Sequence, residues 1–272
     1  MSHPASSAAV ETKAASRPVH GLLEIKDVHL AFGGLKALDG VTFEVPAGKV
    51  SSLIGPNGAG KTTLFNAVSG LLRVHSGAMS FDGHALGALS PERITALGLV
   101  RTFQIARGFP MLTVFEHLMV YGQQQPGERF WQALLGSRAA RQREQQLADR
   151  ALAVARQLKL EAVINHRVTA LSGGQKKLLE IGRALMAQPR MILFDEPAAG
   201  VNPTLAEAIG DHLQAIARGG VTVLIIEHDM ALVGRISEHV IVMAFGKTLA
   251  QGSFDEVRND VAVQDAYFGA RR

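Results

Sequence analysis

The stretch that decides the fold is GPNGAGKT, residues 55–62, which fits the pattern G-x-x-x-x-G-K-[ST]. The short apolar segment VSSLI, residues 50–54, precedes it, and residues 63–70 continue with a partly apolar run. Between a strand and a helix, such a loop directs backbone N–H groups at phosphate oxygens, because its glycines let the chain curl. The sequence therefore predicts a P-loop protein that binds a nucleotide.

This loop supplies most of the predicted nucleotide contacts. Lys61 is placed to reach the β- and γ-phosphates, and the Thr62 hydroxyl is placed to bind Mg²⁺. The helix that begins here would direct its positive N-terminus at the same anion. The candidate nucleotide-binding residues of the loop are Gly55, Pro56, Asn57, Gly58, Ala59, Gly60, Lys61, Thr62 and Thr63. Alone, the motif leaves a small-molecule kinase, a GTPase, a helicase and a transporter ATPase open.

Composition narrows the function classes. The chain has 272 residues and no cysteine, which excludes disulfides, cysteine-bound zinc, iron–sulfur clusters and thiol nucleophiles. The formal net charge is only +4, and the arginines at 138, 141 and 143 are scattered, as on a solvated helix face. We therefore expect no nucleic-acid partner. No apolar run reaches the roughly 18 residues of a membrane span, so we expect a cytoplasmic protein.

Hydrophobic periodicity predicts the arrangement of the domain. Residues 22–32 and 41–45 alternate apolar and polar positions, which is typical of half-buried strands in an antiparallel sheet. A helical pattern follows from about 113 to 187, with residues 122–138 as a loop or a short helix pair. Apolar runs typical of strands buried in a parallel sheet then occur at 191–194, 221–226 and 240–244, with a helix over 205–217. The pattern indicates a parallel α/β core with a helical insertion, and residues 1–20 are expected to be a disordered tail.

Two acidic residues end the first of these later strands, in MILFDE at 191–196. Ligands of open α/β sheets bind at the carboxyl ends of the strands, so both side chains would face the nucleotide. Asp195 is the natural partner of Mg²⁺, and Glu196 is placed to polarise a water that attacks the γ-phosphate. An acidic turn before Pro197 with no role in catalysis is the alternative.

A second glycine-rich helix start is LSGGQ at 171–175. The phosphate-binding loop of this chain is already assigned to residues 55–62. Ser172 is a good helix N-cap, but two glycines in a first helical turn cost about 1 kcal/mol each relative to alanine. This cost is explained if the two glycines let the backbone approach a ligand closely. We therefore expect Ser172, Gly173, Gly174 and Gln175 to face the nucleotide held by another subunit.

These motifs together resemble the ATPase subunits of ABC transporters over residues 22–270. The resemblance implies a single ABC ATPase domain at 21–270: an antiparallel β subdomain and P-loop core at 21–103 and 188–270, and a helical subdomain at about 104–187. It implies ATP and Mg²⁺ as cofactors. It also implies that Phe32 stacks on adenine, that Gln104 contacts Mg²⁺ and takes part in catalysis, and that His228 contacts the γ-phosphate. From the residues alone, Phe32 could equally be a core residue and His228 a polar residue at a strand end.

The resemblance is strongest to the branched-chain amino-acid uptake branch, in the segments FGGLKA at 32–37, DEPAAGVNP at 195–203 and IEHDM at 226–230. The ATPases of urea or amide importers and of the lipopolysaccharide exporter have similar sequences in these segments. Asn202 departs from the family, since many members have Asp there. A soluble ABC ATPase of translation or DNA repair is a further alternative, although such proteins usually carry two cassettes or a long coiled coil.

The resemblance also implies the partners. We expect two hydrophobic permease subunits, a second ABC ATPase that is either a copy of this chain or a sister chain, and, indirectly, a periplasmic solute-binding protein. The protein would then lie at the cytoplasmic face of the inner membrane. A permease helix is expected to dock at residues 105–112, although Phe109 and Met111 could instead be core residues.

Overall fold

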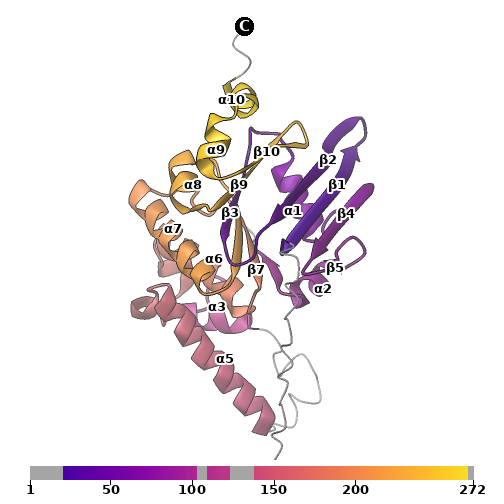
Figure 1. The fold of residues 1–272 in the computed structure, drawn as a ribbon. Coiled ribbons are helices and arrows are strands. Elements are labelled where there is room, and N and C mark those ends of the chain that lie inside the picture. The colour runs from indigo at the N-terminus through magenta and orange to yellow at the C-terminus, as the bar shows by residue number, and fades with distance from the viewer. Residues whose placement is uncertain (1–20, 103–108, 123–137, 269–272) are drawn as a thin grey trace, which may run out of the picture.

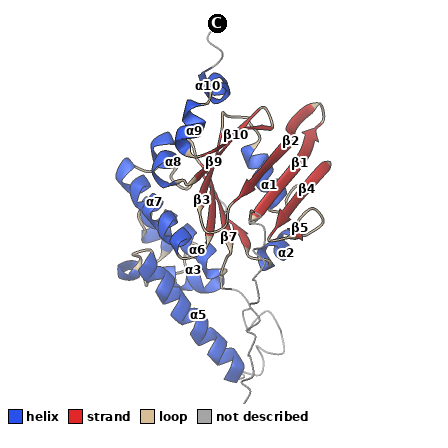
Figure 2. Cartoon of the chain, in the orientation of Figure 1, coloured by secondary structure: helices blue, strands red, loops and turns tan. Residues whose placement is uncertain are grey.

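Two β-sheets form the centre of the computed structural model, which describes residues 21–102, 109–122 and 138–268. An antiparallel sheet has the strand order β2-β1-β4-β5, and a second sheet has the order β10-β9-β3-β8-β7-β6 (Figure 2). The first contains β1 (Leu23–Phe32), β2 (Leu35–Val45), β4 (Ser76–Phe81) and β5 (His84–Ala85). The second contains β3 (Val50–Ile54), β6 (Leu99–Arg101), β7 (Met191–Asp195), β8 (Thr222–Ile226), β9 (His239–Ala244) and β10 (Lys247–Gly252).

The second sheet is parallel from β9 to β6, and β10 joins its edge antiparallel to β9. Strands β3, β7 and β8 and most of β9 are buried on both faces, as their continuous apolar runs predict. The α/β fold with its parallel core and its antiparallel sheet is confirmed. The sequence patterns did not predict β6 or β10, since β6 has only three residues and β10 alternates exposed and half-buried positions.

The helices cover the parallel sheet and continue beyond it. They are α1 (Lys61–Val68), α2 (Pro91–Ala96), α3 (Val114–Val120), α5 (Arg138–Gln157), α6 (Gly173–Met186), α7 (Pro203–Arg218), α8 (Met230–Ile236), α9 (Phe254–Asn259) and α10 (Val261–Phe268). Figure 1 shows α7, α8 and α9 on the side opposite the antiparallel sheet, and α5 extending away from both sheets. The expected loop or helix pair at 122–138 lies almost wholly outside the described residues.

Alternation along the buried strands divides the core. Leu193 and Leu224 pack with the antiparallel sheet and α1, whereas Ile192 and Val223 pack on the other face with helices α3, α5, α6 and α7. A smaller cluster joins Ile54 and neighbours on β9 to the C-terminal helices. Both large clusters include residues of β3 and of β7, and the functional motifs lie at the carboxyl ends of these two strands. Among the helices of the described residues, none is long and apolar enough to cross a bilayer.

Candidate functional site

The phosphate loop joins β3 to α1 at the carboxyl end of the parallel sheet. Gly55 has a φ of 152°, and a Cβ there would lie 2.0 Å from the Met243 carbonyl oxygen. Gly60 has a φ of 101°, and its Cβ would lie 2.4 Å from the Ala37 carbonyl oxygen. Both positions therefore require glycine, because a side chain would meet immovable backbone. At Gly58, with a φ of 80°, nothing lies within 4 Å of the added Cβ.

Lys61 turns back onto this loop. Its Nζ donates hydrogen bonds to the carbonyl oxygens of Gly55, at 2.7 Å, and Pro56, at 3.0 Å. Burial lowers the pKa of the ammonium group, and the negative charges of Glu196 and Asp195 act in the opposite direction. A bound phosphate would act in the same direction as these carboxylates and favour the charged form of the lysine.

A cavity of about 320 Å³ opens over the loop. Motifs from four separate parts of the chain line it: Phe32, Asn57 to Thr63, Glu196 and His228. Phe32 is 51% exposed, so it is a surface aromatic at the mouth of a cavity rather than a core residue. The structure thus brings together the residues that sequence analysis placed on adenine, phosphate and attacking water.

Glu196 and His228 form the polar pair of this cavity. The His228 Nε2 and the Glu196 Oε1 lie 2.8 Å apart. Glu196 has a φ of 52°, a region that side-chain-bearing residues rarely adopt, and its N–H donates to the carbonyl oxygen of Ile226 at 3.0 Å. The chain after β7 is therefore turned so that the Glu196 carboxylate meets the histidine that follows β8.

Asp195 is paired with a residue that sequence analysis did not identify. The Arg101 Nη2 donates to the Asp195 Oδ2 at 3.0 Å, and the Arg101 Nη1 donates to the Asn66 side chain. No sequence pattern marks this contact, because Arg101 and Asp195 are 94 positions apart in the chain. The arginine holds the carboxylate at the carboxyl end of β7.

The oxygen donors at this site suit Mg²⁺. The exposed Thr62 and the Asp195 carboxylate carry oxygen atoms of the hard kind that this ion prefers as ligands. Within the described part of the chain, no group of three His, Cys, Asp or Glu residues could hold a metal. Mg²⁺ commonly completes its shell with phosphate oxygens and water, so this donor set still fits it. Gln104, the third predicted ligand, lies outside the described residues.

Ser172 caps α6, as predicted. The Gln175 N–H donates to the Ser172 Oγ at 3.3 Å, and the Ser172 N–H donates to the Gln175 Oε1 at 2.9 Å, which is a capping box. Gly174 has a packing reason that the sequence did not reveal, since a Cβ there would lie 2.7 Å from Leu205 Cδ2. At Gly173 nothing lies within 4 Å, so the chain's own packing does not require that glycine.

None of these four residues lines the phosphate-loop cavity. The structure therefore does not bring them to the nucleotide of the same chain. Asn202, the departure from the family pattern, caps α7 by accepting the Leu205 N–H at 2.9 Å. Asp would cap this helix equally well, so the capping role does not explain the asparagine.

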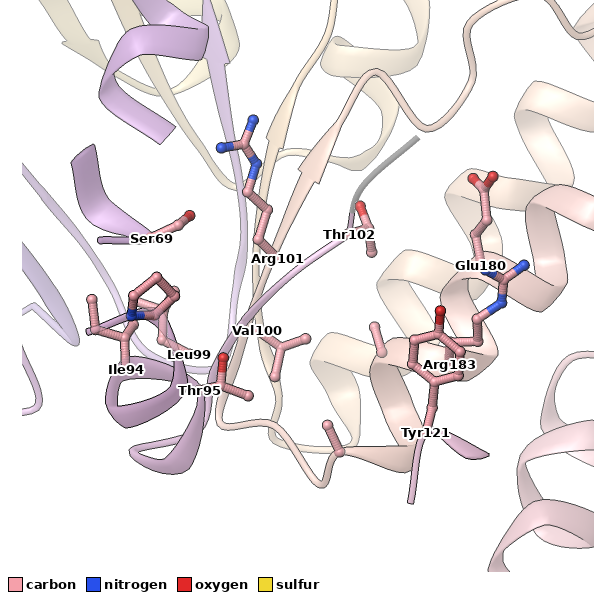
Figure 3. A pocket seen from close by; sticks show the side chains of 13 residues that line it. Ser69, Ile94, Thr95, Leu99, Val100, Arg101, Thr102, Tyr121, Glu180 and Arg183 are labelled. Atoms are coloured by element: carbon pink, nitrogen blue, oxygen red, sulfur yellow. The ribbon is translucent and has the colours of Figure 1, made fainter. Parts of the chain in front are cut away.

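A second cavity, of about 410 Å³, lies where the parallel sheet meets the helical part of the chain. Figure 3 shows Ile94 and Leu99 on one side of it, and Tyr121 and Arg183 from the helical part on the other. The Arg183 guanidinium carbon lies 5.4 Å from the centre of the Tyr121 ring. Thr102, the last described residue before the gap at 103–108, also lines this cavity.

Comparisons with known proteins identify the family. The family model described as "ABC transporter" matches residues 38–199, which span the phosphate loop, the LSGGQ segment and the Asp195–Glu196 pair. The chain belongs to the ABC transporter ATP-binding family. As a member of this family of ATPases, it binds nucleotide and hydrolyses ATP. A second model, "Branched-chain amino acid ATP-binding cassette transporter", matches residues 247–272.

Curated relatives and solved structures agree with this family. The chain is 37% identical to the high-affinity branched-chain amino acid transport ATP-binding protein BraF of Pseudomonas aeruginosa, over 93% of this chain and 99% of that protein. It is 36% identical to a probable branched-chain amino acid transport ATP-binding protein, LivG, of Archaeoglobus fulgidus, over 92% and 96%. The ADP conformation of MJ1267, an ATP-binding cassette of an ABC transporter, superposes with a TM-score of 0.80 at 37% identity, covering 91% of this chain and 98% of that one.

Proposed function

We propose that this ABC ATPase is the motor subunit of an importer for branched-chain or related amino acids. The observation that carries the proposal is the full-length similarity to ATP-binding proteins named for that transport, at 36–38% identity. The match of residues 247–272 to the branched-chain amino acid cassette model adds independent support. The alternatives are a urea or amide importer and a lipopolysaccharide-type exporter. An experiment must distinguish these transporter classes from an amino-acid importer.

In this proposal each ATP binds between two subunits. One subunit contributes Phe32 to adenine and the phosphate loop with Lys61 to the phosphates, while residues 172–175 of the other subunit cover the γ-phosphate. Two features support this arrangement. Gly173 has open space around it, and the positive N-terminus of α6 can bind a phosphate of the nucleotide held by the other subunit. ATP would favour the closed dimer, because only there does the γ-phosphate meet both sides. Hydrolysis would then release the dimer.

The cavity residues would divide the chemistry among them. Glu196 would accept a proton from the attacking water. His228, whose Nε2 lies 2.8 Å from the Glu196 Oε1, would orient that carboxylate and contact the γ-phosphate. Thr62, Asp195 and Gln104 would hold Mg²⁺, which neutralises charge on the phosphates when bound. Lys61 would exchange its two backbone carbonyl partners for phosphate oxygens.

Replacing Ser172 with alanine tests the two-subunit site. We expect Ser172→Ala to lower ATP hydrolysis at least 10-fold while the monomer binds ATP as before. The lost cap costs about 0.5–2 kcal/mol of stability, which must be separated from the loss of a ligand contact. Ser253→Ala is the matched control, because Ser253 caps α9 with the same capping box through Glu256.

Hydrolysis rates and binding of a fluorescent ATP analogue to dilute monomer would be measured for both variants. The control should keep wild-type hydrolysis. If Ser172→Ala weakened nucleotide binding by the monomer, residues 172–175 would belong to the nucleotide site of their own chain and the two-subunit site would be wrong.

A permease subunit would dock at the cavity between the parallel sheet and the helical part. Its largely apolar lining suits a short helix that carries apolar side chains. Phe109 and Met111 are 58% and 63% exposed, so neither is a core residue, and both are free to contact a partner. The chain would then lie at the cytoplasmic face of the membrane, held there by two permease subunits, with a periplasmic binding protein delivering the solute on the other side.

Uptake of labelled solutes tests the cargo. In cells that lack this gene, we expect uptake of radiolabelled leucine, isoleucine or valine to return with the wild-type chain and not with Lys61→Ala. Uptake of labelled urea or amides in place of these amino acids would move the protein to that importer class. Unchanged amino-acid uptake together with a defect in the outer envelope would contradict import and favour lipid export.

A further inference from the structure

Glu227 is a buried carboxyl group to which the proposed chemistry assigns no role. It follows β8 directly and precedes His228, and it is only 4% exposed. A carboxyl group is rarely buried to this extent without partners that compensate for lost hydration. In the sequence, Glu227 lies within the segment IEHDM, and no spacing there marks it as functional.

Its two oxygens bind the backbone of two different loops. The Ala198 N–H donates to the Glu227 Oε1 at 3.0 Å, and the His228 N–H donates to the Oε2 at 3.2 Å. Ala198 lies two residues after Glu196, and His228 carries the imidazole that meets Glu196. One carboxyl group therefore spans the loop that carries the candidate general base and the loop that carries its histidine partner.

A neighbouring backbone bond fixes the same two loops at a second point. The Glu196 N–H donates to the Ile226 carbonyl oxygen at 3.0 Å, one residue before Glu227. Together these contacts leave little freedom for the 2.8 Å spacing between the Glu196 and His228 side chains. Burial raises the pKa of Glu227, its backbone N–H bonds act in the opposite direction, and the charge of Glu196 raises it further.

We propose that Glu227 is a positioning residue that holds Glu196 and His228 at the spacing needed for hydrolysis. This inference rests on the proposed roles of those two residues. A glutamine at 227 would keep the shape but offer one acceptor and one NH₂ group, so one backbone N–H would face a donor instead of an acceptor. The Glu196 loop would move, although the phosphate loop and Phe32 would not.

The expected effect is a loss of kcat without a loss of ATP binding. A displacement of about 1 Å at a catalytic group can cost on the order of 100-fold in rate. We expect Glu227→Gln to lower kcat by about 10- to 100-fold, with the KM for ATP changed less than about threefold. Glu161→Gln is the matched control, since Glu161 is exposed and pairs with Arg156 at 3.3 Å. That control should leave both constants unchanged.

A double-mutant cycle with His228→Ala separates positioning from general stability. Under single-turnover conditions, which detect residual hydrolysis, Glu227→Gln should slow the reaction strongly in the wild-type background and little in the His228→Ala background. Glu227→Asp, which keeps two carboxylate oxygens, should be less impaired than Glu227→Gln. Wild-type kcat in Glu227→Gln, or equal slowing in both backgrounds, would overturn the proposal.

Two further measurements distinguish a structural role of Glu227 from a failure of the proposed role of Glu196. If Glu227→Gln lost binding of a fluorescent ATP analogue, the residue would be structural and the positioning role would be wrong. The parallel variant Glu196→Gln tests the proposed chemistry by itself. If that variant kept wild-type turnover, the failure would lie in the role of Glu196 and not in the contacts of Glu227.

Discussion

Replacing Glu196 with glutamine should almost abolish ATP turnover and leave ATP binding intact. Glutamine keeps the shape of the side chain and a hydrogen-bonding partner for His228, so the cavity should retain its form. It cannot accept a proton from water, however, and general bases contribute roughly 10²- to 10⁴-fold to rate. We therefore expect kcat to fall by about that factor while the affinity for ATP stays within about twofold.

The same variant should accumulate as an ATP-bound closed dimer, because the step that releases the dimer is blocked. Steady-state hydrolysis, nucleotide binding and molecular mass with ATP and Mg²⁺ would be measured side by side. Glu238→Gln is a suitable control, because the side chain of this exposed glutamate pairs with Lys49 at the surface, at 3.8 Å. Turnover that survives the Glu196 change would remove Glu196 from the role of general base.

Replacing Lys61 with alanine should have the opposite signature, with the main loss in ATP binding. The ammonium donates to the carbonyl oxygens of Gly55 and Pro56, and a bound phosphate would replace these neutral partners by charged ones. A hydrogen bond to a charged group is worth about 1.5–3 kcal/mol. The affinity for ATP should therefore fall by roughly 10- to 100-fold.

Titration with a fluorescent ATP analogue measures this directly. Lys49→Ala removes the same charge from an exposed position and should leave the affinity unchanged. Thermal unfolding in the absence of nucleotide should confirm that the Lys61→Ala variant is folded. Wild-type affinity in a folded Lys61→Ala protein would show that Lys61 does not contact the phosphates.

Local motifs explain why much of the site could be predicted from sequence. The phosphate loop lies between a strand and a helix because residues 50–62 carry the strand pattern, the glycines and the helix start in one segment. Asp195 ends a buried strand and Glu196 follows it for the same reason. In both places the position along the chain fixes the position in space, since the carboxyl ends of parallel strands share one edge of the sheet.

Contacts between distant segments explain what the sequence did not reveal. The pairing of Arg101 with Asp195, the packing of Gly174 on Leu205, and the two backbone bonds to Glu227 each join residues from different loops. No periodicity or spacing marks such partners. Strand β6 was missed because three residues are too few for a pattern, although they pair in register with β7. The approach of Glu196 to His228 likewise depends on the order β8-β7 in the sheet.

Recovery of membrane partners tests the central claim most directly, that this ABC ATPase drives transport through permease subunits. Tagged Glu196→Gln protein with ATP and Mg²⁺ would be recovered from gently solubilised native membranes. The Lys61→Ala variant is the control, since it should bind ATP weakly and not form the closed dimer. The account predicts two hydrophobic permeases and a second ATPase, either this chain or a sister chain, identified by mass spectrometry. Recovery of no membrane protein would contradict the transporter assignment and leave a soluble ATPase.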